Sequence, residues 1–166
     1  MLGHVGQGGH SKLNIYIKQL NFVFMKKSKL IFLGIFVLIF NLIWEFSHYG
    51  LYVDLTGIPS TFHLVIASFT DLILISFIFL IISVFRKSIN WIEKPKKSDY
   101  FIIVLFGIII ATIIEIYSLL NGRWAYRDLM PTILGIGISP LIQLFTTVII
   151  GIILLNFLKR CKVISH

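Results

Sequence analysis

Four long apolar runs constrain the fold of this chain more than any other feature of its sequence. They lie at about residues 30–52, 62–85, 100–120 and 133–158. Each supplies the roughly 20 mostly apolar residues that a helix needs to cross the hydrocarbon core of a membrane. With 57% hydrophobic residues and a mean hydropathy of +0.94, the chain carries more apolar surface than a soluble domain of its length can bury. We therefore predict an all-α membrane protein that forms a four-helix transmembrane bundle.

The positively charged residues predict the orientation of this bundle. Three Lys/Arg clusters flank the apolar runs, namely Lys26, Lys27 and Lys29, then Arg86, Lys87, Lys94, Lys96 and Lys97, and finally Lys159, Arg160 and Lys162. Because cytoplasmic loops are enriched in Lys and Arg, we expect both termini and the central connection to be cytoplasmic. The helices then run up-down-up-down, with an N-in/C-in topology. The same clusters explain the net charge of +8 as contact with anionic membrane lipids, which excludes nucleic acid as the expected partner.

The first 24 residues differ from the rest of the chain. They begin with a Gly/His-rich stretch and end just before Met25, which a short Lys-rich segment follows. Many bacterial membrane proteins start with such a Lys-rich segment, so we expect residues 1–24 to be a non-structural extension. The transmembrane domain then covers residues 25–162, residues 163–166 form a tail, and the expected location is the plasma (inner) membrane.

Ionisable residues inside the apolar runs are the clearest functional signal. They are Glu45, His48, His63, Asp71 and Glu115. Such residues are costly in a membrane and usually face a bundle interior or a cavity. At a rise of about 1.5 Å per residue, Glu45, Asp71 and Glu115 all lie roughly 8–13 Å below the outer ends of their helices. The sequence therefore predicts one polar layer in the outer half of the bilayer.

Helical spacing places these residues on defined faces. Three sets share a face: Asn41, Glu45, His48 and Tyr52 in the first run; Gly107, Ala111 and Glu115 in the third; and Ser139, Gln143, Thr146 and Thr147 in the fourth. Small residues beside Glu115 would let a neighbouring helix approach closely. His63 and Asp71 are about 80° apart around their helix, so only a broad face holds both.

Four interpretations of this polar layer remain open, and one of them is passage of an ion or solute, which four short helices would need an oligomer to achieve. Glu45-x-x-His48 is a spacing found in carboxylate metal sites of helix bundles, so Glu45, His48, His63, Asp71 and Glu115 are candidate ligands of a divalent metal. Without a metal, Glu45, His48, Asp71 and Glu115 could serve as general acid and base. Alternatively, the same side chains form a hydrogen-bonded network that only holds the helices together.

The connection 121–131 supplies a second group of candidates. Trp124 and Tyr126 are expected to anchor the membrane interface or to contact a ligand. Arg123 and Arg127 could bind a phosphate head group or neutralise the carboxylates. The predicted substrate-binding residues are Trp44, His63, Arg123, Trp124, Tyr126 and Gln143.

A combination of short motifs runs through the chain. It comprises Trp44-Glu45 with Tyr52, His63 with Asp71, Glu115 with Trp124-x-Tyr126, Met130-Pro131, and Ser139-Pro140-Leu141-x-Gln143. Over residues 30–158 this combination resembles a family of small bacterial four-helix integral membrane proteins with no known activity. The resemblance implies the topology and this set of residues, and it implies no reaction.

We therefore expect a polytopic inner-membrane protein with a carboxylate/His pocket in the outer half of the bilayer. The leading hypothesis is an enzyme that acts on a lipid or isoprenoid substrate. The alternative is a non-catalytic assembly partner, or a module that binds a lipid or solute, with a structural polar network. The expected partners are membrane lipids, another membrane protein or further copies of the chain.

Overall fold

The computed structural model describes residues 7–164, including the side chains of residues 28–161. The chain divides into two compact units, residues 1–32 and residues 33–166. The first unit contains the beginning of a long helix, α1 (Gln7–His48), which continues into the second. The expected extension, residues 1–24, lies partly in this helix and partly outside the described residues, so its non-structural character stays a prediction.

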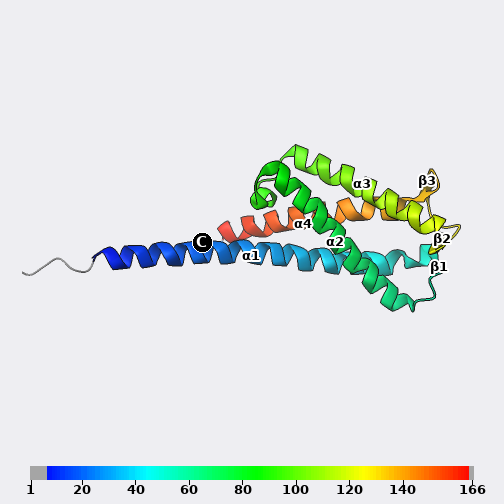
Figure 1. Cartoon of the computed structure of the whole chain (residues 1–166), viewed down its shortest axis with the longest axis horizontal. Helices are drawn as coiled ribbons and strands as arrows, with labels where there is room; N and C mark the ends of the chain where they lie inside the picture. The colour runs from blue at the N-terminus through cyan, green and yellow to red at the C-terminus, as the bar shows by residue number, and fades with distance from the viewer. Residues whose placement is uncertain (1–6, 165–166) are drawn as a thin grey trace, which may run out of the picture. The chain divides into compact units, whose positions relative to one another are not determined.

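Every other element belongs to the second unit, and helices make up most of it (Figure 1). In chain order these elements are the short 3-10 helix η1 (Tyr49–Leu51), strand β1 (Tyr52–Asp54), helix α2 (Ser60–Arg86), the 3-10 helix η2 (Ile89–Glu93), helix α3 (Lys97–Leu120), strands β2 (Trp124–Tyr126), β3 (Thr132–Ile133) and β4 (Ile136–Gly137), and helix α4 (Ile138–Ile164).

Four helical segments of the described chain are long and apolar enough to cross a membrane. They are Ser28–Leu51, Ser60–Arg86, Lys97–Leu120 and Ile138–Cys161, with mean hydropathies between 2.2 and 2.6. This confirms the prediction of a mostly helical protein with four candidate spans. The composition of these helices is compatible with a membrane protein.

The fourth span begins later than the sequence predicts. Residues 133–137, which we expected to be helical, belong to a two-stranded hairpin in which β3 pairs with β4. Leu134 and Gly135 form its tip with φ angles of 53° and 80°. Two successive positive φ values are typical of the two-residue turns that match the twist of a hairpin. Helix α4 therefore starts only at Ile138.

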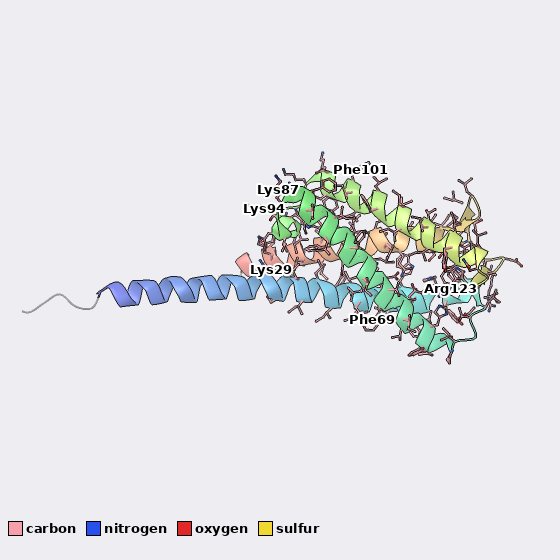
Figure 2. All side chains as sticks on the ribbon, in the orientation of Figure 1. Lys29, Phe69, Lys87, Lys94, Phe101 and Arg123 are labelled. Atoms are coloured by element: carbon pink, nitrogen blue, oxygen red, sulfur yellow. The ribbon has the colours of Figure 1, made fainter. Side chains whose placement is uncertain are left out.

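Polar and apolar side chains in the second unit are distributed as a membrane environment favours. Large apolar side chains such as Phe69 and Phe101 point outward, and they are 50% and 67% exposed (Figure 2). Asn41 and Thr147, by contrast, are completely buried, and Thr147 Oγ1 donates a hydrogen bond of 3.2 Å to Asn41 Oδ1. Hydrogen bonds between helices satisfy polar groups that lipid cannot.

Short strands connect the ends of α1 and α3 in the second unit. β1 pairs antiparallel with β2, so that Tyr52 lies opposite Tyr126 and Asp54 lies opposite Trp124. Tyr52 therefore lies in a strand, although its spacing predicted a last helical turn. Figure 1 shows β1, β2 and β3 close together at one end of this unit, which we call the strand end.

The connection between α2 and α3 lies at the other end of the second unit. Asn156 of α4 donates a hydrogen bond of 2.9 Å from Nδ2 to the main-chain oxygen of Ile92 in η2. Lys87 and Lys94 lie at this end, and Arg123 lies at the strand end (Figure 2). The two ends of the unit thus differ in which basic residues they carry.

Helices α3 and α4 approach each other closely at Gly107. A Cβ atom added there would lie 2.9 Å from Cβ of Phe145 and 3.2 Å from its backbone nitrogen. Ala111 and Glu115 follow at intervals of four residues, and each is only 4% exposed. The predicted common face of Gly107, Ala111 and Glu115 is therefore confirmed as a buried packing surface.

Gly107→Ala is expected to destabilise the protein by about 1–3 kcal/mol, because Phe145 contacts this position with its backbone and Cβ and cannot simply rotate away. Thermal unfolding of the detergent-purified protein would measure the loss. Gly34→Ala is the matched control, since a Cβ at Gly34 of α1 meets no atom within 4 Å. Equal melting temperatures for the two variants would contradict the close approach.

Candidate functional site

Most of the predicted site residues line one cavity at the strand end of the second unit. The cavity has a volume of about 290 Å³, and α1, α2, α3, α4 and the segments that join them form its wall. Eight of the predicted catalytic and binding residues line it: Glu45, His48, His63, Asp71, Glu115, Arg123, Trp124 and Gln143. The polar layer expected from helix geometry is thus a concave site with ionisable groups on its wall.

Gln143 joins two carboxyl groups from different helices. Its Nε2 donates hydrogen bonds of 2.7 Å to Oε1 of Glu45 on α1 and of 2.7 Å to Oδ2 of Asp71 on α2. One amide of α4 thus brings two carboxyl groups, from α1 and from α2, together on the cavity wall.

His48 is held in one tautomer by its own helix. Its Nδ1 lies 2.6 Å from the main-chain oxygen of Trp44, and since a carbonyl only accepts, Nδ1 carries the proton. The other ring nitrogen, Nε2, faces Oε2 of Glu45 at 3.9 Å. Trp44, which we expected to contact a substrate, does not line the cavity, because its ring packs along α1 between Phe40 and His48.

Asp54 and His63 form a pair that the sequence analysis missed. Nδ1 of His63 lies 2.5 Å from Oδ2 of Asp54, while Oδ1 of Asp54 accepts hydrogen bonds from the backbone N–H and the hydroxyl of Thr56 at 2.9 Å and 2.7 Å. Because the carboxylate binds the proton on Nδ1, and no hydrogen bond engages Nε2 of His63 within the described residues, Nε2 can act as a base. A carboxylate orients the catalytic histidine of many hydrolases in this way.

The electrostatic environment of Asp54 favours its charged form. Burial of the side chain raises its pKa, but the hydrogen bonds from His63 and Thr56 outweigh this effect and hold the pKa below the ordinary 3.8. The contacts of Asp54 therefore stabilise the folded protein fully above about pH 4, and this contribution is lost as the pH falls through the lowered pKa.

Asp54→Asn is expected to lower the melting temperature at pH 7, and its difference from the wild type is expected to shrink as the pH falls below the ordinary pKa of 3.8, because the stabilisation by the charged carboxylate is progressively lost. Melting temperatures of the two purified proteins across this range would test the prediction. Asp128→Asn is the control, because Asp128 is exposed and does not line the cavity. A difference between Asp54→Asn and the wild type that stays constant down to pH 3 would contradict the role of charge.

Glu115 is oriented by two aromatic residues of β2. Nε1 of Trp124 and the hydroxyl of Tyr126 donate to the same oxygen, Oε2, at 3.2 Å and 2.5 Å. The hydroxyl of Tyr126 in turn accepts the N–H of Gly137 at 2.9 Å. Burial and the hydrogen bond to Glu115 raise the pKa of Tyr126, so it stays a donor. Tyr126 does not line the cavity and therefore acts through Glu115, not on a ligand directly.

The two arginines of the 121–131 connection have different surroundings. Arg123 is exposed and lines the cavity, and no ion pair joins it to a carboxylate within the described part of the chain. Nε of Arg127 donates a hydrogen bond of 2.9 Å to the main-chain oxygen of Tyr52. Arg127 therefore supports β1, and only Arg123 is placed to meet a ligand in the cavity.

The candidate metal ligands do not converge. No three His, Cys, Asp or Glu side chains between residues 28 and 161 are grouped so that they could hold a metal ion. Glu45 and His48 lie near Asp71, whereas His63 pairs with Asp54 and Glu115 is bonded to aromatic donors. The geometry therefore does not support the predicted metal site. His63 is bonded to Asp54 of β1 and Glu115 to residues of β2, so neither side chain is grouped with Glu45 and His48.

Two further cavity residues were absent from the prediction. Ser118 lines the cavity one helical turn after Glu115, is 1% exposed and has no hydrogen-bond partner for its Oγ. Asp54 lies in Asp54-x-Thr56-Gly57, a sequence typical of a turn in which an aspartate accepts hydrogen bonds from the residues after it. That motif was a signal available in the sequence.

The cavity thus combines a carboxylate-oriented histidine, two carboxyl groups bridged by Gln143 and a carboxylate oriented by aromatic donors. These groups can accept, donate and store protons close to a bound ligand. Comparison of the chain with protein-family models, with curated proteins and with solved structures finds no match in any of the three.

Proposed function

We propose that this chain is a multi-pass enzyme of the bacterial inner membrane that performs acid–base chemistry on the polar end of a lipid or isoprenoid substrate. In this proposal both termini are cytoplasmic and the strand end lies in the outer half of the bilayer. The orientation is supported by Lys87 and Lys94 at the opposite end, since basic residues favour the cytoplasmic side (Figure 2).

The pairing of Asp54 with His63 is the observation that carries the proposal. It orients His63, which lines the cavity, and within the described residues no hydrogen bond engages its other ring nitrogen, Nε2. In this proposal His63 is the general base, and one carboxyl group of the pair Glu45 and Asp71, which Gln143 joins, is the general acid. The cavity thus contains one group that can accept a proton from a substrate and another that can donate one, as a two-step proton transfer requires.

A lipid-like substrate suits the surroundings of the cavity. Ile58 and Ile66 line it and are 41% and 43% exposed, so apolar side chains at the cavity are also accessible from outside the unit. The polar groups lie deeper, on Glu115 and Ser118, which are nearly inaccessible. A molecule with a polar head and an apolar tail matches this arrangement.

Reconstitution tests the proposal directly. The full-length chain in vesicles of bacterial total lipid extract, supplemented with a long-chain isoprenyl phosphate, is expected to convert one species into a product of different mass. Mass spectrometry of the extracted lipids over time would detect it. Vesicles with heat-unfolded protein are the control. Unchanged lipid masses between pH 5 and 9 would contradict an enzymatic function.

The non-catalytic alternative rests on a different observation, the bridge that Gln143 makes between Glu45 and Asp71. Such a bridge would hold α1, α2 and α4 together in an assembly partner or in an oligomer of this chain. The alternative predicts that variants of Glu45, Asp71 and Gln143 lose stability in parallel with any cellular effect. The enzyme proposal predicts that His63 variants keep their stability and lose only turnover.

A further inference from the structure

Glu115 presents one unused carboxylate oxygen to the cavity. Both of its hydrogen bonds, from Trp124 and Tyr126, end on Oε2. Within the described residues no hydrogen bond reaches Oε1, although the side chain is buried and lines the cavity. A carboxylate that two donors hold in place, with its other oxygen unbonded, is oriented to accept a hydrogen bond from a ligand.

Ser118 provides a second unused acceptor beside it. Its Oγ is buried without a hydrogen-bond partner, although it lies three residues after Glu115 on the same face of α3 and lines the same cavity. Leaving a buried hydroxyl unpaired costs about 1–3 kcal/mol. Because Glu115 Oε1 and Ser118 Oγ can both accept, a ligand group with several N–H donors would satisfy them together.

Aromatic rings complete the surroundings of these acceptors. Tyr49, Tyr52 and Trp124 line the cavity, and the rings of Tyr52 and Trp124 meet edge to face with centroids 6.1 Å apart. Burial and the neighbouring charge of Glu115 raise the pKa of Tyr52, so its ring stays neutral. Neutral aromatic rings next to a carboxylate are the surroundings that an ammonium group prefers.

A positive charge stands at the exposed side of the same cavity. Arg123 lines the cavity and is exposed, with no carboxylate partner in the part of the chain that the structure describes. Its planar guanidinium matches two oxygens of a phosphate group. The cavity therefore carries a cation at its exposed side and carboxylates within.

We propose that this cavity binds an aminophospholipid head group, with the phosphate at Arg123 and the primary ammonium at Glu115 and Ser118. The inference rests on the proposed function, for which it names the substrate class. A primary ammonium has three donors for the unused acceptors, whereas the trimethylammonium of a choline lipid has none and needs more of the roughly 290 Å³. The exposed Ile58 and Ile66 at the cavity favour a lipid over a soluble ester as the source of this chemistry.

Lipid binding to the purified full-length chain tests this inference without requiring turnover. Native mass spectrometry in a mild detergent would compare dioleoyl phosphatidylethanolamine with the phosphatidylcholine and phosphatidylglycerol of the same chains. We expect the ethanolamine lipid to bind at least about tenfold more tightly than either, the effect of one additional charge-assisted hydrogen bond. Equal affinities for the three lipids would overturn the inference. Free phosphoethanolamine competing as strongly as the lipid would overturn its lipid source.

Variants assign the recognition to individual groups. Glu115→Gln and Ser118→Ala are expected to reduce the preference for ethanolamine over choline about tenfold and several-fold, respectively. Arg123→Gln should weaken all three phospholipids equally. Asp128→Asn, which removes an exposed carboxylate outside the cavity, should leave the preference unchanged. Ser118→Ala removes a single oxygen atom and is therefore expected to fold. It can test the proposed contact even if Glu115→Gln does not fold. An unchanged preference in folded Ser118→Ala protein contradicts the proposed contact.

Failure of this inference can be distinguished from failure of the enzyme proposal. Selective binding of the ethanolamine lipid with no conversion of any lipid in vesicles would remove the enzymatic function and leave the head-group site. Conversion of a lipid that has no amine, together with unselective binding, would keep the enzymatic function and remove the inferred head group.

Discussion

Gln143→Leu is expected to lower the free energy of unfolding by about 2–4 kcal/mol, although Leu has nearly the volume of Gln. The amide of Gln143 donates to Glu45 and to Asp71 at 2.7 Å, and its side chain is 4% exposed. Leu removes both donors and provides no replacement. Two carboxyl groups therefore lose a hydrogen bond at once.

Unfolding of the detergent-solubilised protein, by heat or by increasing fractions of a denaturing detergent, would measure this loss. Thr70→Val is the control, because Thr70 is exposed and its hydroxyl bonds only to the backbone of its own helix. Adding Asp71→Asn to Gln143→Leu restores a donor facing Glu45 and is expected to recover at least about 1 kcal/mol. A Gln143→Leu protein within about 0.5 kcal/mol of the wild type would show that the bridge contributes little to stability.

The meeting of Glu45, Asp71 and Gln143 could be predicted because a helix converts sequence spacing into position. The rise per residue placed Glu45 and Asp71 at similar depths, and the 3.6-residue period selected the stripe that contains Gln143. The same reasoning identified the close packing at Gly107. Each of these conclusions needs only that a segment is helical and that its polar face turns inward.

The strand end could not be predicted in the same way. Asp54 follows the last turn of α1, where the chain becomes extended, so helical periodicity carries no information about its direction. Its strand β1 pairs with β2, and the three residue pairs of this ladder join positions 70 to 74 residues apart. Such short non-local pairing leaves no periodic pattern in the sequence. Tyr52 was placed in the wrong element for this reason, yet its ring still contacts His48, at 5.3 Å between centroids.

His63→Gln is expected to reduce turnover of the lipid substrate by a factor of about 10²–10⁴, the usual contribution of a general base. Gln can still donate to Asp54 but has no basic nitrogen, so substrate affinity and protein stability should change little. The rate of product formation in reconstituted vesicles would measure the effect, with Asp128→Asn as the control for an unrelated substitution at the strand end.

Asp54→Asn separates the role of the pair from that of the histidine alone. An amide at this position can present its N–H groups to His63 and favour the other tautomer, which turns the proton toward the cavity and removes the base. The single variants and the double variant Asp54→Asn/His63→Gln should therefore show similar losses, because residues that act as a unit are not additive. Losses that multiply in the double variant would mean that Asp54 and His63 act independently. Full turnover in His63→Gln would exclude His63 as the base and leave the carboxyl pair of Glu45 and Asp71 as the titratable centre of the cavity.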